Sequence, residues 1–159
     1  MGIFLLATFL AVDFAFAAIA MENTVTAAQM EKDFAARRAQ FVIERYFDCQ
    51  HGSGYRLVDS GDPSSVKLAA TLLAHADACV TESLQTALGT AMARRPAVVL
   101  PYVNTNERLQ AARICLPFIS DEDSPARRQA VVARTRRALL RVHSRTLARQ
   151  RAACLVEAR

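Results

Sequence analysis

The chain has 159 residues, of which 52% are hydrophobic, five are glycine and none is tryptophan. A chain of this length can bury a hydrophobic core without oligomerisation. Its abundant alanine, with no alternating β-branched runs, favours helices over strands. The formal net charge of +5 is unevenly spread: residues 126–159 carry ten arginines and one acid, whereas residues 1–125 carry ten basic and fourteen acidic side chains. We therefore expect a mildly acidic body joined to one strongly basic element.

The first twenty residues have the pattern of an export signal. Residues 3–12 form an apolar run, and the segments that end at Ala17 and Ala20 have the A-x-A form that signal peptidase recognises. We therefore expect residues 1–20 to be a cleaved signal peptide and residues 21–159 to be a single α-helical domain. The expected location is the periplasm.

Other interpretations of this segment remain open. No lysine or arginine precedes the apolar run, and Asp13 interrupts it, at a cost in a bilayer core. The alternatives are a buried N-terminal helix, or a start codon set wrongly, with the true one upstream or at Met21. A third is a retained anchor, although the run is shorter than the ~20 apolar residues of a membrane span.

The first predicted helix begins near Thr24 or Thr26. Thr26 and Gln29 have capping-box spacing, and apolar residues then recur with a helical period until about Gln50. Residues 52–62, which open with a glycine- and serine-rich cluster, are expected to form a loop.

A second helix begins at Asp62-Pro63, an N-cap acid followed by proline. Its apolar stripe starts at Val66 and continues to Arg94-Arg95, with Gly89 as a candidate bend. Residues 96–100 form one short helical turn before the next proline.

The remaining predicted helices are one short helix and one long basic helix. Asn104 or Asn106 caps the short helix, and Pro117 ends it. Ser124-Pro125 opens the last helix, which extends to Cys154. The overall prediction is an all-α fold, a compact bundle of about four to six helices stapled by two disulfides.

The four cysteines are Cys49, Cys79, Cys115 and Cys154. An even number in an exported chain indicates disulfides, and four cysteines allow three connectivities. We favour the pairs Cys49–Cys79 and Cys115–Cys154, because each pair then joins neighbouring helices. A zinc site is the alternative, but the chain lacks the C-x2-C pair typical of such sites, so neither a metal site nor a redox-active thiol is expected.

Arginines recur on one face of the last predicted helix, at Arg134, Arg137, Arg141, Arg145 and Arg149. This row predicts an acidic protein partner or an anionic envelope surface, and its alternative is a solvated face without a partner. No nucleic acid is expected, because the chain carries an export signal and no aromatic residues interleave with the arginines. Arg136 and Arg151 lie off the row and are expected to form buried or interfacial ion pairs.

No motif of known chemistry is present. The chain lacks a phosphate-binding loop, a dinucleotide-binding glycine motif and H-E-x-x-H, so no catalytic residue and no cofactor is predicted. Its histidines are His51 in the predicted loop, His75, and His143, which is expected on the buried side of the last helix. The alternative enzyme hypothesis is a small hydrolase that uses His51 with Asp59 or Asp62.

Two apolar segments, Ala87-Leu88-Gly89 with residues 95–100 and then residues 114–119, are followed late in the chain by Cys154-Leu155. In these motifs the second half of the chain resembles a group of small, uncharacterised exported α-helical proteins of Gram-negative bacteria. The resemblance implies a periplasmic location and a helical fold paired through Cys115 and Cys154. It implies no activity and no catalytic residue.

These features favour a non-enzymatic periplasmic protein-binding domain. Its most concrete form is an inhibitor or immunity protein that acts against a secreted toxin. The alternative is an envelope-associated structural or stress protein that docks on anionic surfaces through its basic C-terminal helix. We expect the contact surface to be the arginine row or the loop at residues 52–62.

Overall fold

The computed structural model describes residues 25–49 and 52–159, in which every regular element is a helix. The elements are α1 (Ala27–Tyr46), α2 (Gly54–Asp59), α3 (Pro63–Leu72), α4 (Ala78–Arg94), α5 (Pro96–Val99), η1 (Leu100–Tyr102), η2 (Glu107–Leu109), α6 (Ala111–Ile114), α7 (Pro125–Leu140) and α8 (Ala148–Glu157). Disulfides join Cys49 to Cys79 and Cys115 to Cys154. The predicted all-α fold with two disulfides is confirmed, and the favoured connectivity is correct. The predicted signal peptide lies outside the described residues.

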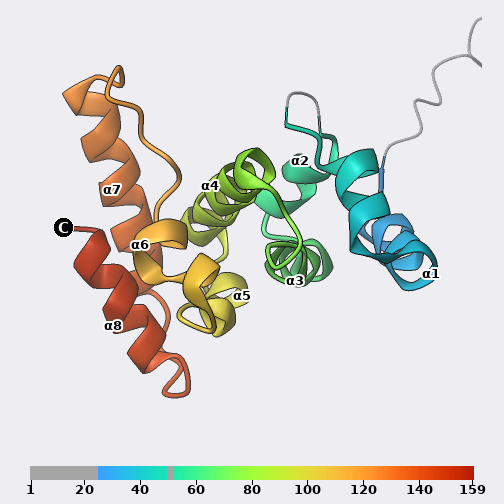
Figure 1. Ribbon diagram of the computed structural model, residues 1–159. Helices are drawn as coiled ribbons and strands as arrows, with labels where there is room; N and C mark the ends of the chain where they lie inside the picture. Colours follow the sequence, from blue (N-terminus) through green and yellow to red (C-terminus); the bar gives the residue numbers. More distant parts are fainter. Residues whose placement is uncertain (1–24, 50–51) are drawn as a thin grey trace, which may run out of the picture.

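Helix α4 occupies the centre of the molecule (Figure 1). It packs against α2 and α3 on one side and against α6 and α7 on the other. Helix α1 lies beyond α2 and α3, while α7 and α8 lie together at the opposite end. The disulfides follow this division: Cys49–Cys79 connects the end of α1 to the start of α4, and Cys115–Cys154 connects the end of α6 to α8.

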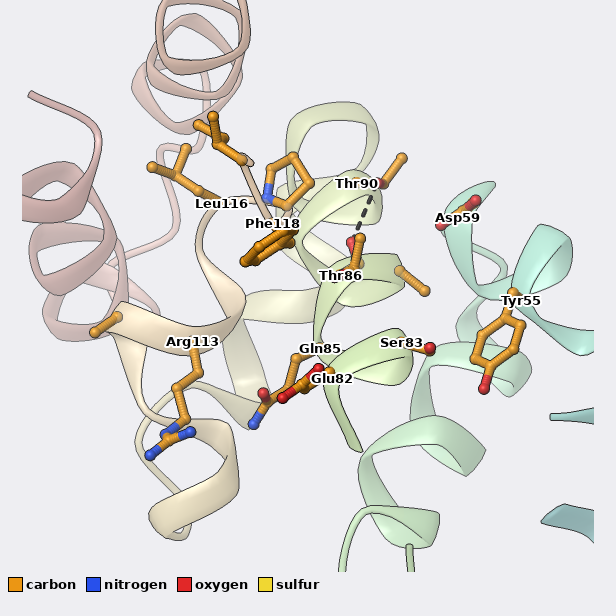
Figure 2. A pocket seen from close by; sticks show the side chains of 14 residues that line it. Tyr55, Asp59, Glu82, Ser83, Gln85, Thr86, Thr90, Arg113, Leu116 and Phe118 are labelled. Carbon is orange, nitrogen blue, oxygen red and sulfur yellow. Dashed lines mark hydrogen bonds between the residues drawn. The ribbon is translucent and has the colours of Figure 1, made fainter. Parts of the chain in front are cut away.

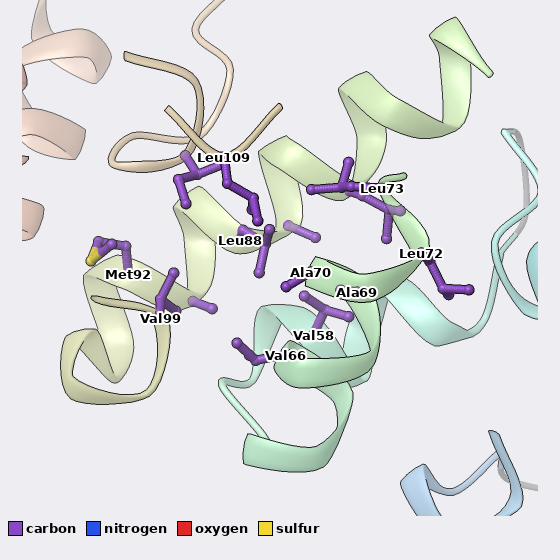
Figure 3. Close-up of a cluster of buried hydrophobic side chains, with 14 of the residues drawn as sticks. Val58, Val66, Ala69, Ala70, Leu72, Leu73, Leu88, Met92, Val99 and Leu109 are labelled. Atoms are coloured by element: carbon purple, nitrogen blue, oxygen red, sulfur yellow. The ribbon is translucent and has the colours of Figure 1, made fainter. Parts of the chain in front are cut away.

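Buried side chains from several helices surround α4 (Figure 3). Leu72 and Leu73 come from the end of α3, Leu88 and Met92 from α4, and Val99 from α5. All five are fully buried, and burying each large apolar side chain stabilises the fold by roughly 1.5–3 kcal/mol. Surfaces that are built on α4 therefore rest on a well-packed support.

Several helix starts coincide with the predicted N-caps. Thr26 Oγ1 accepts a hydrogen bond from the backbone N–H of Gln29 at 3.2 Å, and the Asp62 carboxylate accepts one from Ser65 at 2.8 Å. Ser124 caps α7 in the same way. Each bond satisfies an N–H group that has no partner inside its helix, so these predicted starts are confirmed.

Residues 52–62, which we expected to form a loop, contain α2. Contacts with the segment after α1 hold this helix: the Tyr55 hydroxyl donates to the carbonyl of Phe47 at 2.8 Å, and the two rings meet edge to face with centroids 5.3 Å apart. Helix α1 ends at Tyr46, before its predicted end near Gln50, which lies outside the described residues. Aromatic packing therefore overrides the glycine-rich composition of this segment.

The predicted second helix is interrupted at residues 73–77, which separate α3 from α4. Arg108 stabilises the interruption, because its Nη1 donates to the carbonyls of Leu73 and Ala76, each at 2.7 Å. Asp77 then caps α4 by accepting a hydrogen bond from a backbone N–H in its first turn. The break depends on an arginine 35 residues from Leu73, which no local pattern indicates.

The predicted last helix is also interrupted. Helix α7 ends at Leu140, and α8 begins at Ala148 and runs back beside α7 (Figure 1). A continuous helix from Ser124 to Cys154 would be about 45 Å long. The reversal brings Cys154 within disulfide distance of Cys115, with the two Cα atoms 5.2 Å apart.

Two arginines stabilise this reversal. Arg136 Nη1 donates to the carbonyl of Ala158 at 3.3 Å, and Arg151 Nη1 donates to the carbonyl of Val142. Within the described ranges neither arginine forms an ion pair, so the expectation of buried ion pairs inside the fold was wrong, and an interfacial pair stays a prediction. His143 lies exposed in the connection, so its predicted burial was wrong as well, because the helix that would have buried it ends before this residue.

Helix α1 bends sharply at Arg38. The backbone there has φ 74° and ψ 171°, a region that residues other than glycine occupy at a cost of about 1–3 kcal/mol. The Tyr46 hydroxyl donates to Asp33 Oδ2 at 2.5 Å and thereby connects the two arms. This hydrogen bond holds the pKa of Asp33 below its usual value.

We expect Thr135→Val to stabilise the protein. The Thr135 side chain on α7 is fully buried, and its hydroxyl has no hydrogen-bond partner among residues 25–49 and 52–159. Valine has nearly the same shape without the polar atom, so the free energy of unfolding should rise by about 1 kcal/mol, as measured by urea denaturation. Thr90→Val is the control, because the Thr90 hydroxyl donates to the carbonyl of Thr86 at 3.1 Å. A loss of stability in Thr135→Val would contradict the prediction.

Candidate functional site

A groove of about 740 Å³ runs along α4 (Figure 2). Its floor is formed by side chains of α4: Ser83, Thr86, Ala87 and Thr90. Tyr55 and Asp59 of α2 form one wall, and α6 with the segment that follows it forms the other. We call that segment, residues 115–119, the strap.

Gly89 lets the strap approach α4 closely. A Cβ atom at Gly89 would lie 2.3 Å from the carbonyl carbon and oxygen of Leu116 and 2.3 Å from the nitrogen of Pro117. Helix α4 continues without interruption through this position, so the candidate bend at Gly89 was wrong. The glycine instead provides space for the backbone of another segment.

Phe118 is the most prominent feature of the strap. It is 77% exposed, whereas Cys115 at the other end of the strap is fully buried in its disulfide. Figure 2 shows the Phe118 ring over α4, close to Thr86. A second cavity of about 260 Å³ lies on the α7 side, and Phe118, Thr86 and Thr90 line both cavities. The exposed ring therefore stands between two hollows on a supported backbone.

Charged residues of both signs line the two cavities. Asp59 and Glu82 line the larger one, and Arg94 and Arg134 line the smaller one, although Arg94 also lies close enough to Asp59 to act on its pKa. Two further charged residues of the second cavity, Asp123 and Arg127, neutralise each other in an ion pair of 3.0 Å. Arg113 on the α6 wall also lines the larger cavity, so the charges of that cavity largely offset one another.

Asp59 is the half-buried carboxylate of this site. Burial raises the pKa of Asp59, and the positive charge of Arg94 opposes that effect. Among the described residues no hydrogen-bond donor or ion-pair partner reaches its carboxylate. Asp59 is therefore able to accept a hydrogen bond or an ion pair from a ligand.

We expect Asp59→Asn to stabilise the protein at neutral pH. Because the folded-state pKa of Asp59 is raised, ionising this carboxyl costs more in the fold than in the unfolded chain. The cost is present above the folded pKa and disappears as the pH falls below the unfolded value of about 3.8. The variant should therefore melt at a higher temperature than the parent near pH 7 and at the same temperature near pH 3. A lower melting temperature near pH 7 would contradict the prediction.

The predicted arginine row does not exist as one face of one helix. Arg134 and Arg137 lie on α7, Arg141 and Arg145 lie in the connection, and Arg149 lies on α8. The reversal between α7 and α8 divides the row, although all five side chains are exposed. Only Arg134 lines the groove on the α7 side. A role in binding stays a prediction for all five arginines.

The residues of the alternative hydrolase hypothesis are not all available for chemistry. Both the backbone N–H and the hydroxyl of Ser65 donate to the Asp62 carboxylate, so Asp62 serves as a helix cap. Asp59 lines the groove, and His51 lies outside the described residues. His75 is exposed in the turn between α3 and α4.

Residues 25–49 and 52–159 contain neither a candidate metal-binding cluster nor a helix suited to span a membrane. No three or more His, Cys, Asp or Glu side chains in these ranges are placed to hold a metal ion. Likewise, none of the helices described there combines the length and the apolar character needed to cross a membrane.

Sequence reasoning did not identify Phe118 or Arg94 as site residues, and it named Asp59 only in the alternative hydrolase hypothesis. Phe118 lies in an apolar segment, residues 114–119, whose composition is equally typical of a buried strand or helix end. The available signal was Gly89, because a glycine inside a helix often marks the close approach of another backbone. No protein-family model, curated protein or solved structure matches this chain.

Proposed function

We propose that this protein is a non-enzymatic, exported binding domain that recognises another polypeptide through the groove along α4. The observation that carries the proposal is Phe118, an aromatic ring that is 77% exposed on a strap held by a buried disulfide. Exposed aromatic anchors on rigid supports dominate the energetics of protein interfaces, since little entropy is lost when they bind.

The surroundings of Phe118 support binding rather than catalysis. The Thr90 hydroxyl donates to the carbonyl of Thr86 within its own helix, and the Asp59 carboxylate has no donor in reach among the described residues. Catalysis by a hydroxyl nucleophile requires a base in hydrogen-bond contact with it, and neither group has that arrangement.

The two disulfides indicate an oxidising environment and so support export. A periplasmic location, with residues 1–20 as signal peptide, is part of the proposal. An inhibitor or immunity protein directed at a secreted toxin is its most concrete form, because small, rigid, disulfide-stabilised domains suit that task.

The proposal is tested by panning a phage-displayed random-peptide library on the immobilised, oxidised protein. Selected peptides should bind the parent and lose about 30-fold in affinity for Phe118→Asp, the loss typical of a binding hot spot. The control is Leu140→Asp, which alters another exposed apolar residue, 54% exposed at the end of α7. An equal loss of peptide affinity in both variants would overturn the proposal. It would also be overturned if panning on the parent enriched peptides no more strongly than panning on Phe118→Asp.

The second candidate function is docking on an anionic envelope surface. It is favoured by the exposed arginines outside the groove, among them Arg137, Arg141, Arg145 and Arg149. Co-sedimentation with vesicles that contain anionic lipid should then be strong at low salt and weak at high salt, because exposed charges are screened. Vesicle binding that is absent at low salt would exclude this function.

A further inference from the structure

We propose that a cleft between α7 and the end of α8 binds a long-chain alkanoate, the carboxylate form of a free fatty acid. The cleft has a volume of about 680 Å³ and is lined by side chains of α7, between Arg128 and Arg136, and by Ala158 and Arg159. None of these residues lines either cavity beside the strap, so the cleft is separate from the groove along α4. The inference therefore goes beyond the proposed function and does not rest on it.

The floor of the cleft is apolar. Val132 and Ala133 of α7 line it from one side, and Ala158, just after α8, lines it from the other. These residues come together because α8 runs back beside α7 (Figure 1). Val132 packs against the core, so the floor rests on the buried part of the fold. Covering such a surface with hydrocarbon removes apolar area from water, which is favourable.

Arginines surround this floor without an acidic partner. Arg128, Arg136 and Arg159 line the cleft, no acidic side chain lines it, and none of the three forms an ion pair within the described ranges. Backbone carbonyls hold two of them: Arg128 donates to two carbonyls of the segment before α7, and Arg136 donates to Ala158. A guanidinium group has five N–H donors, so both retain donors for a carboxylate.

The carboxylate is assigned to the end of the cleft formed by Arg136 and Arg159. Arg136 gives only Nη1 to a carbonyl, and Arg159 directly follows Ala158, whose carbonyl accepts that bond. Arg128 lies two turns earlier, about 12 Å along α7, and uses both Nε and Nη2 on carbonyls. Two guanidinium groups near one point attract an anion more strongly than one. The alkyl chain then runs over Val132 toward the methylene stem of Arg128.

A hydrocarbon chain suits this floor better than a polypeptide. The backbone N–H and C=O groups of α7 bond to each other within the helix, and the carbonyl of Ala158 accepts a bond from Arg136. Apart from the arginines, Gln129 provides the one polar side chain among the described residues that line the cleft. A peptide placed there would cover its own N–H and C=O groups without partners, whereas an alkyl chain has no such groups.

The inference is tested by titrating the oxidised protein with decanoate, below the concentration at which it forms micelles, in a calorimeter. The parent should bind decanoate saturably. Ala133→Glu places a carboxylate and extra bulk in the floor, so its affinity should fall at least about tenfold. The matched control is Ala130→Glu, the same change at an exposed position of α7 that lines none of the three cavities, and it should bind like the parent.

The head group is tested with decan-1-ol, which has the same chain without a charge. The parent should bind it about three- to tenfold more weakly than decanoate. Arg136→Gln/Arg159→Gln should bind the two ligands alike. Because Arg136 also holds Ala158, the helicity of this variant is checked by circular dichroism. Arg159→Gln alone leaves that hydrogen bond intact and should lose part of the preference for decanoate.

Four results would overturn the inference. The first is equal affinity of the parent for decanoate and decan-1-ol, and the second is an equal loss in Ala133→Glu and Ala130→Glu. The third is a loss of decanoate binding in Phe118→Asp, which should bind decanoate like the parent, because that loss would place the chain in the groove along α4. The fourth is an absence of decanoate binding together with binding to anionic vesicles that Ala133→Glu weakens, which would assign the cleft to a membrane lipid.

Discussion

Removing one disulfide with the double substitution Cys115→Ala/Cys154→Ala is expected to lower the free energy of unfolding by about 4 kcal/mol. The two cysteines lie 39 residues apart, and the crosslink restricts that loop in the unfolded chain. Both side chains are fully buried, so their truncation also leaves small voids in the core. In a thermal unfolding experiment the melting temperature should fall by roughly 12–16 °C.

The matched control is Cys49→Ala/Cys79→Ala. These cysteines lie 30 residues apart and are exposed, so the expected loss is about 3.5 kcal/mol, with no void in the core. The two variants should differ more in their affinity for Phe118-dependent peptides than in their free energy of unfolding. Loss of the Cys115–Cys154 bond frees one end of the strap, so binding of Phe118-dependent peptides should weaken. Equal binding by both variants would contradict the role of that bond in holding Phe118.

The parts of this fold that follow from nearby residues could be predicted. Thr26, Asp62 and Ser124 each begin a helix, because a side-chain oxygen three residues before an N–H group satisfies it without help from the rest of the chain. The all-α class follows from composition and from helical periodicity in the same way. Local chemistry is sufficient for such features, and the structure confirms them.

The interruptions of the two long predicted helices could not be predicted. The break at residues 73–77 depends on Arg108, which donates to two carbonyls at the end of α3, and the break after Leu140 accompanies the return of Cys154 to Cys115. In both places the local apolar period continues through the break. Contacts between distant parts of the chain decide where these helices end, and the local periodicity of apolar residues does not indicate such contacts.

The candidate site was hidden for a related reason. Phe118 and Leu116 belong to one short apolar segment, yet Phe118 is exposed and Leu116 packs against the core. The type of an apolar residue does not show whether its side chain faces the core or solvent. A binding anchor such as Phe118 is therefore distinguished from a core residue only when the positions of the neighbouring backbone segments are known. The predicted arginine row was wrong because Arg134 and Arg149 could share one face only if a single continuous helix contained both.

Gly89→Ala is expected to lower the free energy of unfolding by about 3 kcal/mol, although alanine is the better helix former by about 1 kcal/mol. The new Cβ would lie 2.3 Å from backbone atoms of Leu116 and Pro117, and a backbone cannot move aside as the end of a side chain can. The strap must therefore lift from α4, and Phe118-dependent peptide binding should fall together with stability. Urea denaturation and peptide titration of the same sample measure both effects.

Ala130→Gly provides the comparison for this prediction. Ala130 is exposed on α7 and lines neither cavity beside the strap, so its replacement reports the helix preference for alanine over glycine in this protein. That variant should lose about 1 kcal/mol and bind peptides like the parent. If the free energy of unfolding rises in Gly89→Ala by about as much as it falls in Ala130→Gly, only helix propensity acts at position 89. The strap would then not rest on α4. If both variants lose stability and only Gly89→Ala binds peptides more weakly, the absence of a Cβ atom at Gly89 is what allows α4 to support Phe118, the aromatic anchor of the groove.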